Sequence, residues 1–426
     1  TYRKLIDKVH GVFVRHIEKS GWPISGRLSN ADVFDKLVAP KLLESGRRVA
    51  YLLIDAMRYE LGVELAKHLN EAGQIDVQMA CAQMPTVTPV GMATLLPGAG
   101  QNLKITNKDN QLLVVFGDQP LATVAQRMDV LRKKYGQRFA EMELVRFVRD
   151  HPKIESTVEL LVIRSNDMDN DFEANPEAAP GLISRTFQKI RSAIYKLRDL
   201  GFQDVIIATD HGFFLNTAIE PGDVCVKPSG KWINVHERTL LGDGIGDASN
   251  LVLPSEMFGI KGDFNQVAVP RAMVAYRAGQ WYFHGGLSLQ EAIVPVIAVK
   301  IRAAETGIGS KLSVMLNYKR GSKKITTRLP VIEVEAGASD LFAQETELLI
   351  EAYDVKGHVV GEAKLGGPVN PATRIITLKP GDTIPITLKM DMDFEGKFVV
   401  KALDPITQTA LGKPLEIGRA SCRERG

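Results

Sequence analysis

The sequence has few cysteines, no long apolar run, no repeat and no low-complexity tract. It contains three cysteines in 426 residues, and Cys422 lies in an unusual C-terminal segment. The other two, Cys81 and Cys225, cannot form a disulfide framework, which favours a reducing, cytoplasmic setting. No run approaches the roughly 18 apolar residues of a membrane-spanning helix, so the sequence predicts no membrane span.

A strong charge excess is also missing. Residues 417–426, apart from the last one, resemble a common sequencing-adapter oligonucleotide translated in frame, and we expect them to be a sequencing scar. This segment holds three arginines and one glutamate, so without it the formal net charge falls from +3 to +1. The overall charge therefore gives no argument for a nucleic-acid partner. Because the chain begins at Thr1 without an initiator Met, we expect a fragment.

Residues 46–304 alternate short apolar runs with helical patterns. Strands that alternate with helices of this length predict a parallel, largely buried sheet flanked by helices. Residues 1–45 space their apolar side chains helically, and we expect them to be the helical end of a truncated N-terminal region. The apolar runs expected to be strands are 49–54, 77–82, 159–163 and 204–208. The two clearest expected helices are 58–72 and 182–200.

The pattern changes over residues 305–416. Several short runs alternate apolar and polar residues, Gly, Pro, Asn or Asp marks most gaps, and no helical stretch intervenes. This pattern predicts an antiparallel β-sandwich after the α/β part. The six runs are 311–318, 325–335, 347–354, 374–378, 384–390 and 396–402.

Carboxylates and imidazoles follow two of the expected buried strands. Asp55 ends the run at 49–54, and Asp210 and His211 follow the run at 204–208. In open α/β sheets, ligands bind in the crevice at the carboxyl ends of the strands. These side chains therefore predict one metal-binding crevice built from distant segments.

A Pro-Thr-Val-Thr-Pro segment lies between these strand ends and offers two hydroxyls, Thr86 and Thr88. A threonine before Pro89 can be an ordinary N-cap of the following helix. It can also be a nucleophile activated by a metal ion. Local sequence leaves both interpretations open.

Two further segments carry candidate ligands. Asp169 and Glu173 lie in an acidic stretch after the run at 159–163, where a solvated loop is the alternative. His284 precedes two glycines, which permit close approach of a ligand, although a lone histidine is more often structural.

Taken together, the chain order Asp, Thr, Asp, Asp-His and His-Gly-Gly, each at an expected strand end, resembles the alkaline phosphatase superfamily. Within it, four motifs resemble the PglZ family of BREX-type phage-defence systems: Asp-Ala-Met-Arg-Tyr-Glu, Pro-Thr-Val-Thr-Pro, Arg-Ser-Asn-Asp-Met-Asp and His-Gly-Gly-Leu-Ser-Leu-Gln-Glu. The resemblance covers about residues 46–303 and implies an alkaline-phosphatase-like domain with two divalent metal ions. It implies Asp55, Thr88, Asp210 and His211 for one ion, with Thr88 as nucleophile, and Asp169 and His284 for the other.

The chain departs from nucleotide-pyrophosphatase-type members of the superfamily at one ligand. Those members carry His four residues after the Asp that corresponds to Asp169, whereas this chain has Glu173. Carboxylate-rich sites suit Mg²⁺ or Mn²⁺ and imidazole-rich sites suit Zn²⁺, so the identity of the ions stays open. The departure also weakens the expectation of strong phosphatase activity.

Arg58 and the basic stretch from Arg127 to Arg149 each have two interpretations. Arg58 follows the first strand end and can neutralise a substrate phosphate, or it can pair with Glu60. The basic stretch from Arg127 to Arg149 can track nucleic acid, or it can be a solvated helix face.

The functional expectation is a metal-dependent phosphoester hydrolase, such as a phosphodiesterase or nuclease, that works with other phage-defence proteins. One alternative is a weakly active or inactive scaffold that binds the partners in the defence complex. A phosphomutase-like enzyme is a third, and it normally needs a fuller second ligand set than this sequence offers.

Overall fold

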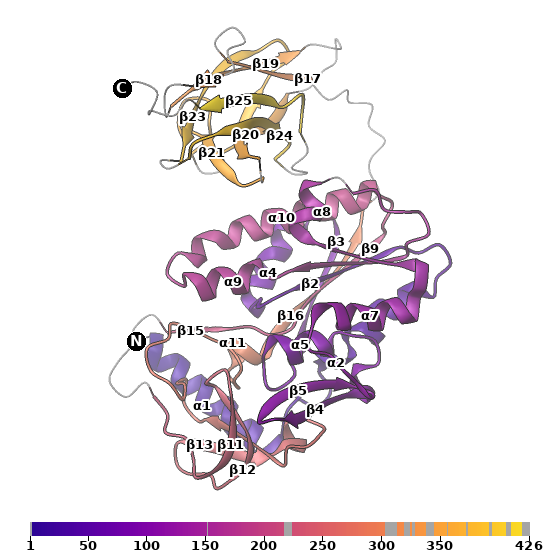
Figure 1. Cartoon of the computed structure of the whole chain (residues 1–426), viewed down its shortest axis with the longest axis vertical. Coiled ribbons are helices and arrows are strands. Elements are labelled where there is room, and N and C mark those ends of the chain that lie inside the picture. Colours follow the sequence, from indigo (N-terminus) through magenta and orange to yellow (C-terminus); the bar gives the residue numbers. More distant parts are fainter. Residues whose placement is uncertain are drawn as a thin grey trace. The chain divides into compact units, whose positions relative to one another are not determined.

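The computed structural model of the chain forms two compact units, Thr1–Ala303 and Ala304–Gly426 (Figure 1). Each unit has its own apolar core. No helix in the described part of the chain is long and apolar enough to cross a membrane. The structure describes residues 2–150, 152–216, 224–302, 313–318, 324–325, 329–337, 345–355, 357–371, 374–391, 394–405 and 410–419.

A seven-stranded sheet forms the centre of the first unit. Its middle strands are buried along their whole length, as expected for strands covered by helices on both faces. Leu52 lies between Ile207 on one neighbour and Ile163 on the other. In spatial order the strands are β1 (Leu28–Ser29), β3 (Gly73–Cys81), β16 (Ile293–Ile301), β9 (Asp204–Thr209), β2 (Val49–Ile54), β8 (Leu160–Ser165) and β7 (Phe139–Glu143).

The predicted parallel sheet flanked by helices is confirmed, with one strand running the other way. β16 pairs antiparallel with both β3 and β9, whereas the other pairs are parallel. The short helix α11 (Leu289–Ala292) leads directly into β16 from the carboxyl edge of the parallel strands. A strand that enters from that edge must run back against its neighbours.

Helices cover both faces of this sheet (Figure 1). α4 (Tyr59–Leu69) and α10 (Ile183–Asp199) lie on one side, and α5 (Thr88–Thr94) and α7 (Val124–Tyr135) lie on the other. The apolar stripe expected over 182–200 is the buried face of α10, where Phe187, Ile190, Ile194 and Leu197 are at most 7% exposed.

Residues before the first long strand pack onto the same core. They form α1 (Tyr2–Ser20), α2 (Asn30–Val33), a π-helical turn (Phe34–Val38) and α3 (Ala39–Leu42). Phe13, Ile17 and Phe34 belong to the core of the first unit. The expected N-terminal helical region is therefore a structural part of this unit.

Smaller sheets are inserted between the strands of the central one. A three-stranded sheet contains β4 (Leu103–Lys108), β5 (Gln111–Phe116) and β6 (Gln119–Pro120). A pair joins β10 (Phe214–Leu215) to β15 (Tyr282–Phe283). A four-stranded antiparallel sheet has the order β11 (Gly230–Val235), β12 (Thr239–Gly244), β14 (Gln266–Pro270) and β13 (Asn250–Pro254).

The second unit consists of strands that form one connected, largely antiparallel sheet around a shared core. β20 and β23 each change partner along their length, as strands do when they pass between the layers of a sandwich or barrel. The only parallel pair among the described strands here is β18 with β25. The strands are β17 (Ser313–Asn317), β18 (Lys324–Ile325), β19 (Val331–Gly337), β20 (Thr346–Asp354), β21 (Val359–Ala363), β22 (Ile376–Leu378), β23 (Thr383–Met390), β24 (Lys397–Leu403) and β25 (Leu415–Arg419).

The segment expected to be an adapter scar begins inside β25. Ile417 pairs with Phe398 and is 2% exposed. Residues 420–426 lie outside the described residues.

Candidate functional site

The carboxyl ends of β2 and β9 place two carboxylates side by side. Ile54 pairs with Thr209, so the residues that follow them, Asp55 and Asp210, leave the sheet at the same level. The turn after β2 is tied to β9, because the Ala56 amide donates to Asp210 Oδ1 (3.2 Å). Ala56 itself has φ 61°, which few residues with a Cβ adopt. Asp55 and Asp210 are buried, at 5% and 0% exposure.

Asp210 and His211 present acceptor atoms to each other. Asp210 Oδ1 accepts from the backbone amide of His211 (2.9 Å), whereas the buried Oδ2 accepts no hydrogen bond among the described residues. His211 Nδ1 donates to the carbonyl oxygen of Gly212 (2.9 Å), which leaves a lone pair on Nε2 only 3.3 Å from Asp210 Oδ2. Two facing acceptors without a proton between them fit a divalent cation bound by both.

The side chain of Thr88 faces this pair. Its hydroxyl lies 3.4 Å from Asp55 Oδ1 and 3.2 Å from His211 Nε2. The N-cap of α5 is Val87, without a side-chain hydrogen bond, so Thr88 does not cap the helix. Thr86 instead donates to the Gly286 carbonyl (2.8 Å) and accepts from the Gly285 amide (3.1 Å). Thr88 thus faces the carboxylates, while Thr86 fastens the neighbouring loop.

A second group of ligand atoms lies beside the first. The carboxylate of Asp169, from α9 (Asp167–Ala174), lies close to the rings of His211 and His284, and the ligand atoms of these three residues are within 4.8 Å of one another. Asp55, Asp210 and His211 form the other such group, so His211 belongs to both.

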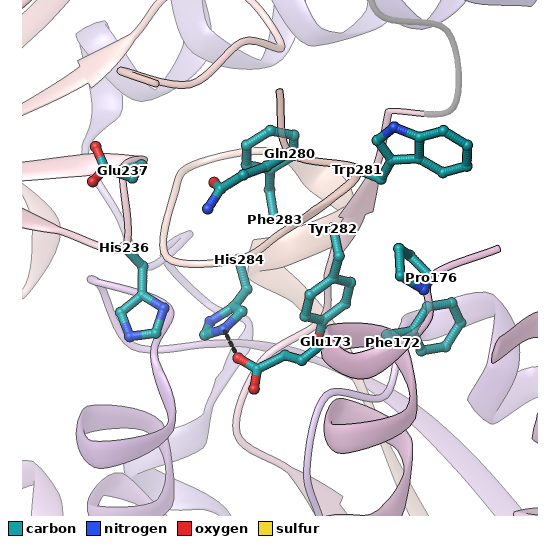
Figure 2. A pocket seen from close by; sticks show the side chains of 10 residues that line it. All are labelled: Phe172, Glu173, Pro176, His236, Glu237, Gln280, Trp281, Tyr282, Phe283 and His284. Carbon is teal, nitrogen blue, oxygen red and sulfur yellow. Dashed lines mark ion pairs between the residues drawn. The ribbon is translucent and has the colours of Figure 1, made fainter. Parts of the chain in front are cut away.

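The second group is held by its own hydrogen bonds. Tyr282 donates its hydroxyl to Asp169 Oδ1 (2.5 Å), and His284 Nδ1 donates to the Thr86 carbonyl (3.3 Å). His284 Nε2 is then left facing Glu173, whose carboxylate oxygen lies 3.8 Å away (Figure 2). Like His211, His284 directs Nε2 into the site and uses Nδ1 to bond a backbone carbonyl, the arrangement common among metal-binding histidines.

Burial and the crowding of like charges displace the pKa values of these groups. Burial and then the carboxylate of Asp210 raise the pKa of Asp55 well above its ordinary value. Burial raises the pKa of Asp210 to about 6 and lowers that of His211 to about 3. Burial opposes protonation of His284 too, but Glu173 and Asp169 raise its pKa. Several acids that resist ionisation in one buried place fit a site that is completed by positive charge.

The predicted site residues are therefore brought together. Asp55, Thr88, Asp210 and His211 form one half, and Asp169 and His284 with Glu173 at the rim form the other. A cavity of about 400 Å³ opens beside the second half. Its lining includes Phe172, Glu173, His236, Trp281, Tyr282 and His284 (Figure 2).

Arg58 makes the alternative contact that the sequence left open. Its Nη2 pairs with Glu60, and its guanidinium lies 5.5 Å from the centre of the Phe213 ring. The buried Nε has no hydrogen-bond partner among the described residues.

The basic stretch from Arg127 to Arg149 does not form one uniform charged face. Arg127 is buried at 7% exposure. The exposed arginines pair with acids, as Arg132 does with Asp129 and Arg146 does with Glu143.

Two features beside the site were not predicted from the sequence. Arg238 and Glu291 form a buried bidentate ion pair, with bonds of 3.0 and 2.6 Å, and Glu291 also accepts from the Gly286 amide (2.9 Å). This pair fixes the turn that follows His284. The second feature is His236, whose ring centroid lies 4.5 Å from that of His284. Both Arg238 and His236 lie in a short polar turn without any local signal of their position.

Comparison with known proteins agrees with the motifs. The alkaline phosphatase-like protein PglZ of Bacillus cereus (strain H3081.97) is 26% identical over 328 residues, which are 73% of this chain and 37% of that protein. The alkaline phosphatase-like protein BrxZ of Escherichia coli O9:H4 (strain HS) is 25% identical over 308 residues, which are 66% of this chain and 33% of that protein. The chain thus spans about a third of the length of these relatives.

Solved structures to which the chain shows some similarity include phosphonoacetate hydrolase from Sinorhizobium meliloti 1021 in complex with phosphonoformate or phosphonoacetate. They are 14% and 15% identical to this chain, with TM-scores of 0.39 and 0.38, and the match covers 61% of this chain and 92% of theirs. A likeness this distant bears on neither substrate nor mechanism. A family model described as the BREX system PglZ alkaline phosphatase-like domain matches residues 33–299, more than half of the sequence. The chain therefore belongs to the PglZ family, as its motifs predicted.

Proposed function

We propose that the chain is a metal-dependent phosphoester hydrolase that acts within a phage-defence system. The observation that carries the proposal is the position of the Thr88 hydroxyl, 3.4 Å from Asp55 Oδ1 and 3.2 Å from His211 Nε2. The same Nε2 lies 3.3 Å from Asp210 Oδ2, which has no hydrogen-bond partner among the described residues. A hydroxyl in such a cluster is the arrangement that nucleophilic catalysis needs.

Divalent cations fit the two halves of the cluster. Asp55, Asp210 and His211 would hold one ion, and Asp169 and His284 the other, with Glu173 at its rim. Bound ions would lower the pKa of the Thr88 hydroxyl and neutralise the phosphoryl oxygens during displacement. Mg²⁺ or Mn²⁺ suits the carboxylates, and Zn²⁺ suits the imidazoles.

The side chains of this chain would then carry the reaction. Thr88 Oγ forms a bond to phosphorus while the bond from phosphorus to the leaving oxygen breaks. The hydroxyl proton would pass through Asp55, to which Thr88 already donates, to the leaving oxygen, which departs as an alcohol. Water would then attack the phosphorus of the phosphothreonine while the bond from phosphorus to Thr88 Oγ breaks. One proton of that water would pass through Asp55 to Thr88 Oγ, which restores the hydroxyl. Arg58, whose Nε is unpaired, is placed to neutralise substrate charge if it releases Glu60.

The cavity beside His284 would receive part of the substrate. Its volume of about 400 Å³ is in the range of small-molecule sites. A phosphodiester is the substrate class that we favour, including nucleic acid. Buried free thiols at Cys81 and Cys225 support a reducing, cytoplasmic setting.

A scaffold within the defence complex is the second candidate. Both groups of ligand atoms lie in the first unit, and none is found among the described residues of the second. A β unit without such chemistry suits partner binding. In this case the metal site would stabilise the fold without turnover.

The deciding experiment compares the chain with its Asp210→Asn variant. Asn keeps an oxygen for the amides of Ala56 and His211 and removes the charge that a cation needs. We expect hydrolysis of bis(p-nitrophenyl) phosphate with Mn²⁺ or Zn²⁺ to fall by orders of magnitude in the variant, with melting temperature and binding of defence partners retained. If the Asp210→Asn variant supports phage resistance to the same degree as the original chain, the hydrolase proposal is overturned and the scaffold proposal remains.

A further inference from the structure

The turn between β11 and β12 has an unfavourable backbone. The Arg238 amide donates to the Val235 carbonyl (3.2 Å), which closes a β-turn with His236 and Glu237 at its centre. These two residues have φ 45° and 55°. Positive φ at both central positions is typical of Asn-Gly in two-residue hairpin turns. Residues with a Cβ seldom adopt positive φ, and residues that their surroundings hold there cluster at functional sites.

Contacts on both sides of the turn fix it against the loop that carries His284. Thr239 donates its hydroxyl to the Gly285 carbonyl (2.6 Å), and Arg238 reaches the same loop through Glu291. Gly285 permits this approach, because a Cβ on it would lie 3.0 Å from the Cβ of His236. The inserted sheet is thus attached to the site at the position of His236.

The result is a third imidazole beside the second group of ligands. The ring of His236 lies 4.5 Å from that of His284, at 46° to it. Figure 2 shows His236 on one side of His284 and Glu173 on the other, all lining the cavity. Among the described residues, the ring of His236 makes no hydrogen bond, so its nitrogens are available.

We propose that His236 is a ligand of the ion that Asp169 and His284 hold, supplied by the inserted hairpin. The inference rests on the metal centre of the proposed function and adds a residue to it. An imidazole from the hairpin gives this half two imidazoles, those of His236 and His284, beside the acids Asp169 and Glu173. This donor set is richer in nitrogen than the strand ends alone supply, and it suits Zn²⁺ better than Mg²⁺.

The test measures ion binding without substrate. Calorimetric titration of the metal-free chain with Zn²⁺ is compared among four variants. His236→Gly removes the imidazole and suits positive φ, so the metal-free melting temperature should not fall. Glu237→Gly is the matched control, since it relaxes the same turn and keeps the imidazole. His284→Ala and Asp210→Asn identify the binding step of each half.

His284→Ala should abolish binding of one Zn²⁺ ion, and Asp210→Asn should abolish binding of the other. We expect His236→Gly to lower the affinity for the first ion by about tenfold or more and to leave the affinity for the second unchanged. Glu237→Gly should bind Zn²⁺ like the original chain. Equal affinity in the two glycine variants would overturn the proposal, and so would a chain that binds no ion at the His284 half. A chain that binds both ions but hydrolyses no phosphodiester would refute the hydrolase and leave this inference standing.

Discussion

The imidazole of His211 stacks on that of His284, with ring centroids 4.4 Å apart and planes within 4° of parallel. His211 follows β9 and His284 follows β15, so the stack joins the two halves of the site through one contact. Since burial holds the pKa of His211 near 3, this ring is neutral at physiological pH, the form that binds metal ions.

Thr88→Ala should lower metal-dependent diester hydrolysis by about 10³-fold or more, because the attacking oxygen is lost. Thr88→Ser keeps a hydroxyl and should retain most of the activity. Rates are measured alongside melting temperature. Thr106→Ala, which loses a hydroxyl on β4 that bonds the Leu113 carbonyl, serves as a threonine control. Equal activity in Thr88→Ala and Thr106→Ala would exclude Thr88 as the nucleophile.

Gly91→Ala should damage both the fold and the site. A Cβ at this position of α5 would lie 2.6 Å from Asp210 Cβ and 2.8 Å from its carbonyl oxygen. Relief requires α5 to move away from the end of β9, which carries Thr88 away from Asp55. We expect a loss of about 1–3 kcal/mol in the free energy of unfolding and weaker metal binding.

The control for this change is Gly100→Ala, whose Cβ would meet nothing closer than 3.8 Å. Calorimetry and metal titration of both variants check the prediction. It is wrong if the two variants bind metal equally well.

Breaking the Arg238–Glu291 pair from one side should cost roughly 3–5 kcal/mol in the free energy of unfolding, because a buried charge is left alone. The two side chains are 1% and 0% exposed. Glu291→Gln and Arg238→Met are each compared by urea denaturation with Lys36→Met, which removes an exposed pair with Asp32. The exposed change should alter stability by about 0.5 kcal/mol or less. Similar losses in all three variants would show that the buried pair is not critical.

His10 should make stability fall in mild acid. It is 3% exposed, neither ring nitrogen has a hydrogen-bond partner among the described residues, and burial lowers its pKa to about 4. Between pH 6.5 and 4 the unfolded chain therefore binds more protons at this residue than the folded chain does, so stability decreases as pH decreases across this window. Above about pH 7 the effect vanishes.

The effect amounts to roughly 3 kcal/mol at most for the full shift. Denaturant unfolding at pH 5 and pH 8 measures it, with His10→Leu as the comparison. The difference between the two pH values should be smaller in His10→Leu than in the original chain. If the stability difference between pH 5 and pH 8 is the same in His10→Leu and the original chain, residues other than His10 cause the acid sensitivity.

The strands and helices around the site were readable from the sequence because their signals are local. The apolar run at 49–54 is β2 to the residue, and the stripe over 182–200 is α10 within one residue at each end. Parallel strands have a common edge, which is why Asp55 and Asp210 could be expected to meet.

The direction of β16 and the position of His236 were not readable. The apolar run of β16 is compatible with a parallel or an antiparallel strand. The direction of β16 is decided by the path of the chain before it. His236 reaches the site through a turn whose positive φ values its residue types do not favour. The partners that hold this turn, such as Gly285, lie about 50 residues further along the sequence.

The central place of β16 sets the order in which the protein can be completed. It is the last strand of its sheet to leave the ribosome, yet it lies between β3 and β9. Until residue 301 has been made, the sheet exists as two parts, and each presents an unpaired edge along most of its length. Such edges invite pairing with other chains. A nascent or truncated chain that ends before residue 293 should therefore need a chaperone, however complete its catalytic carboxylates already are.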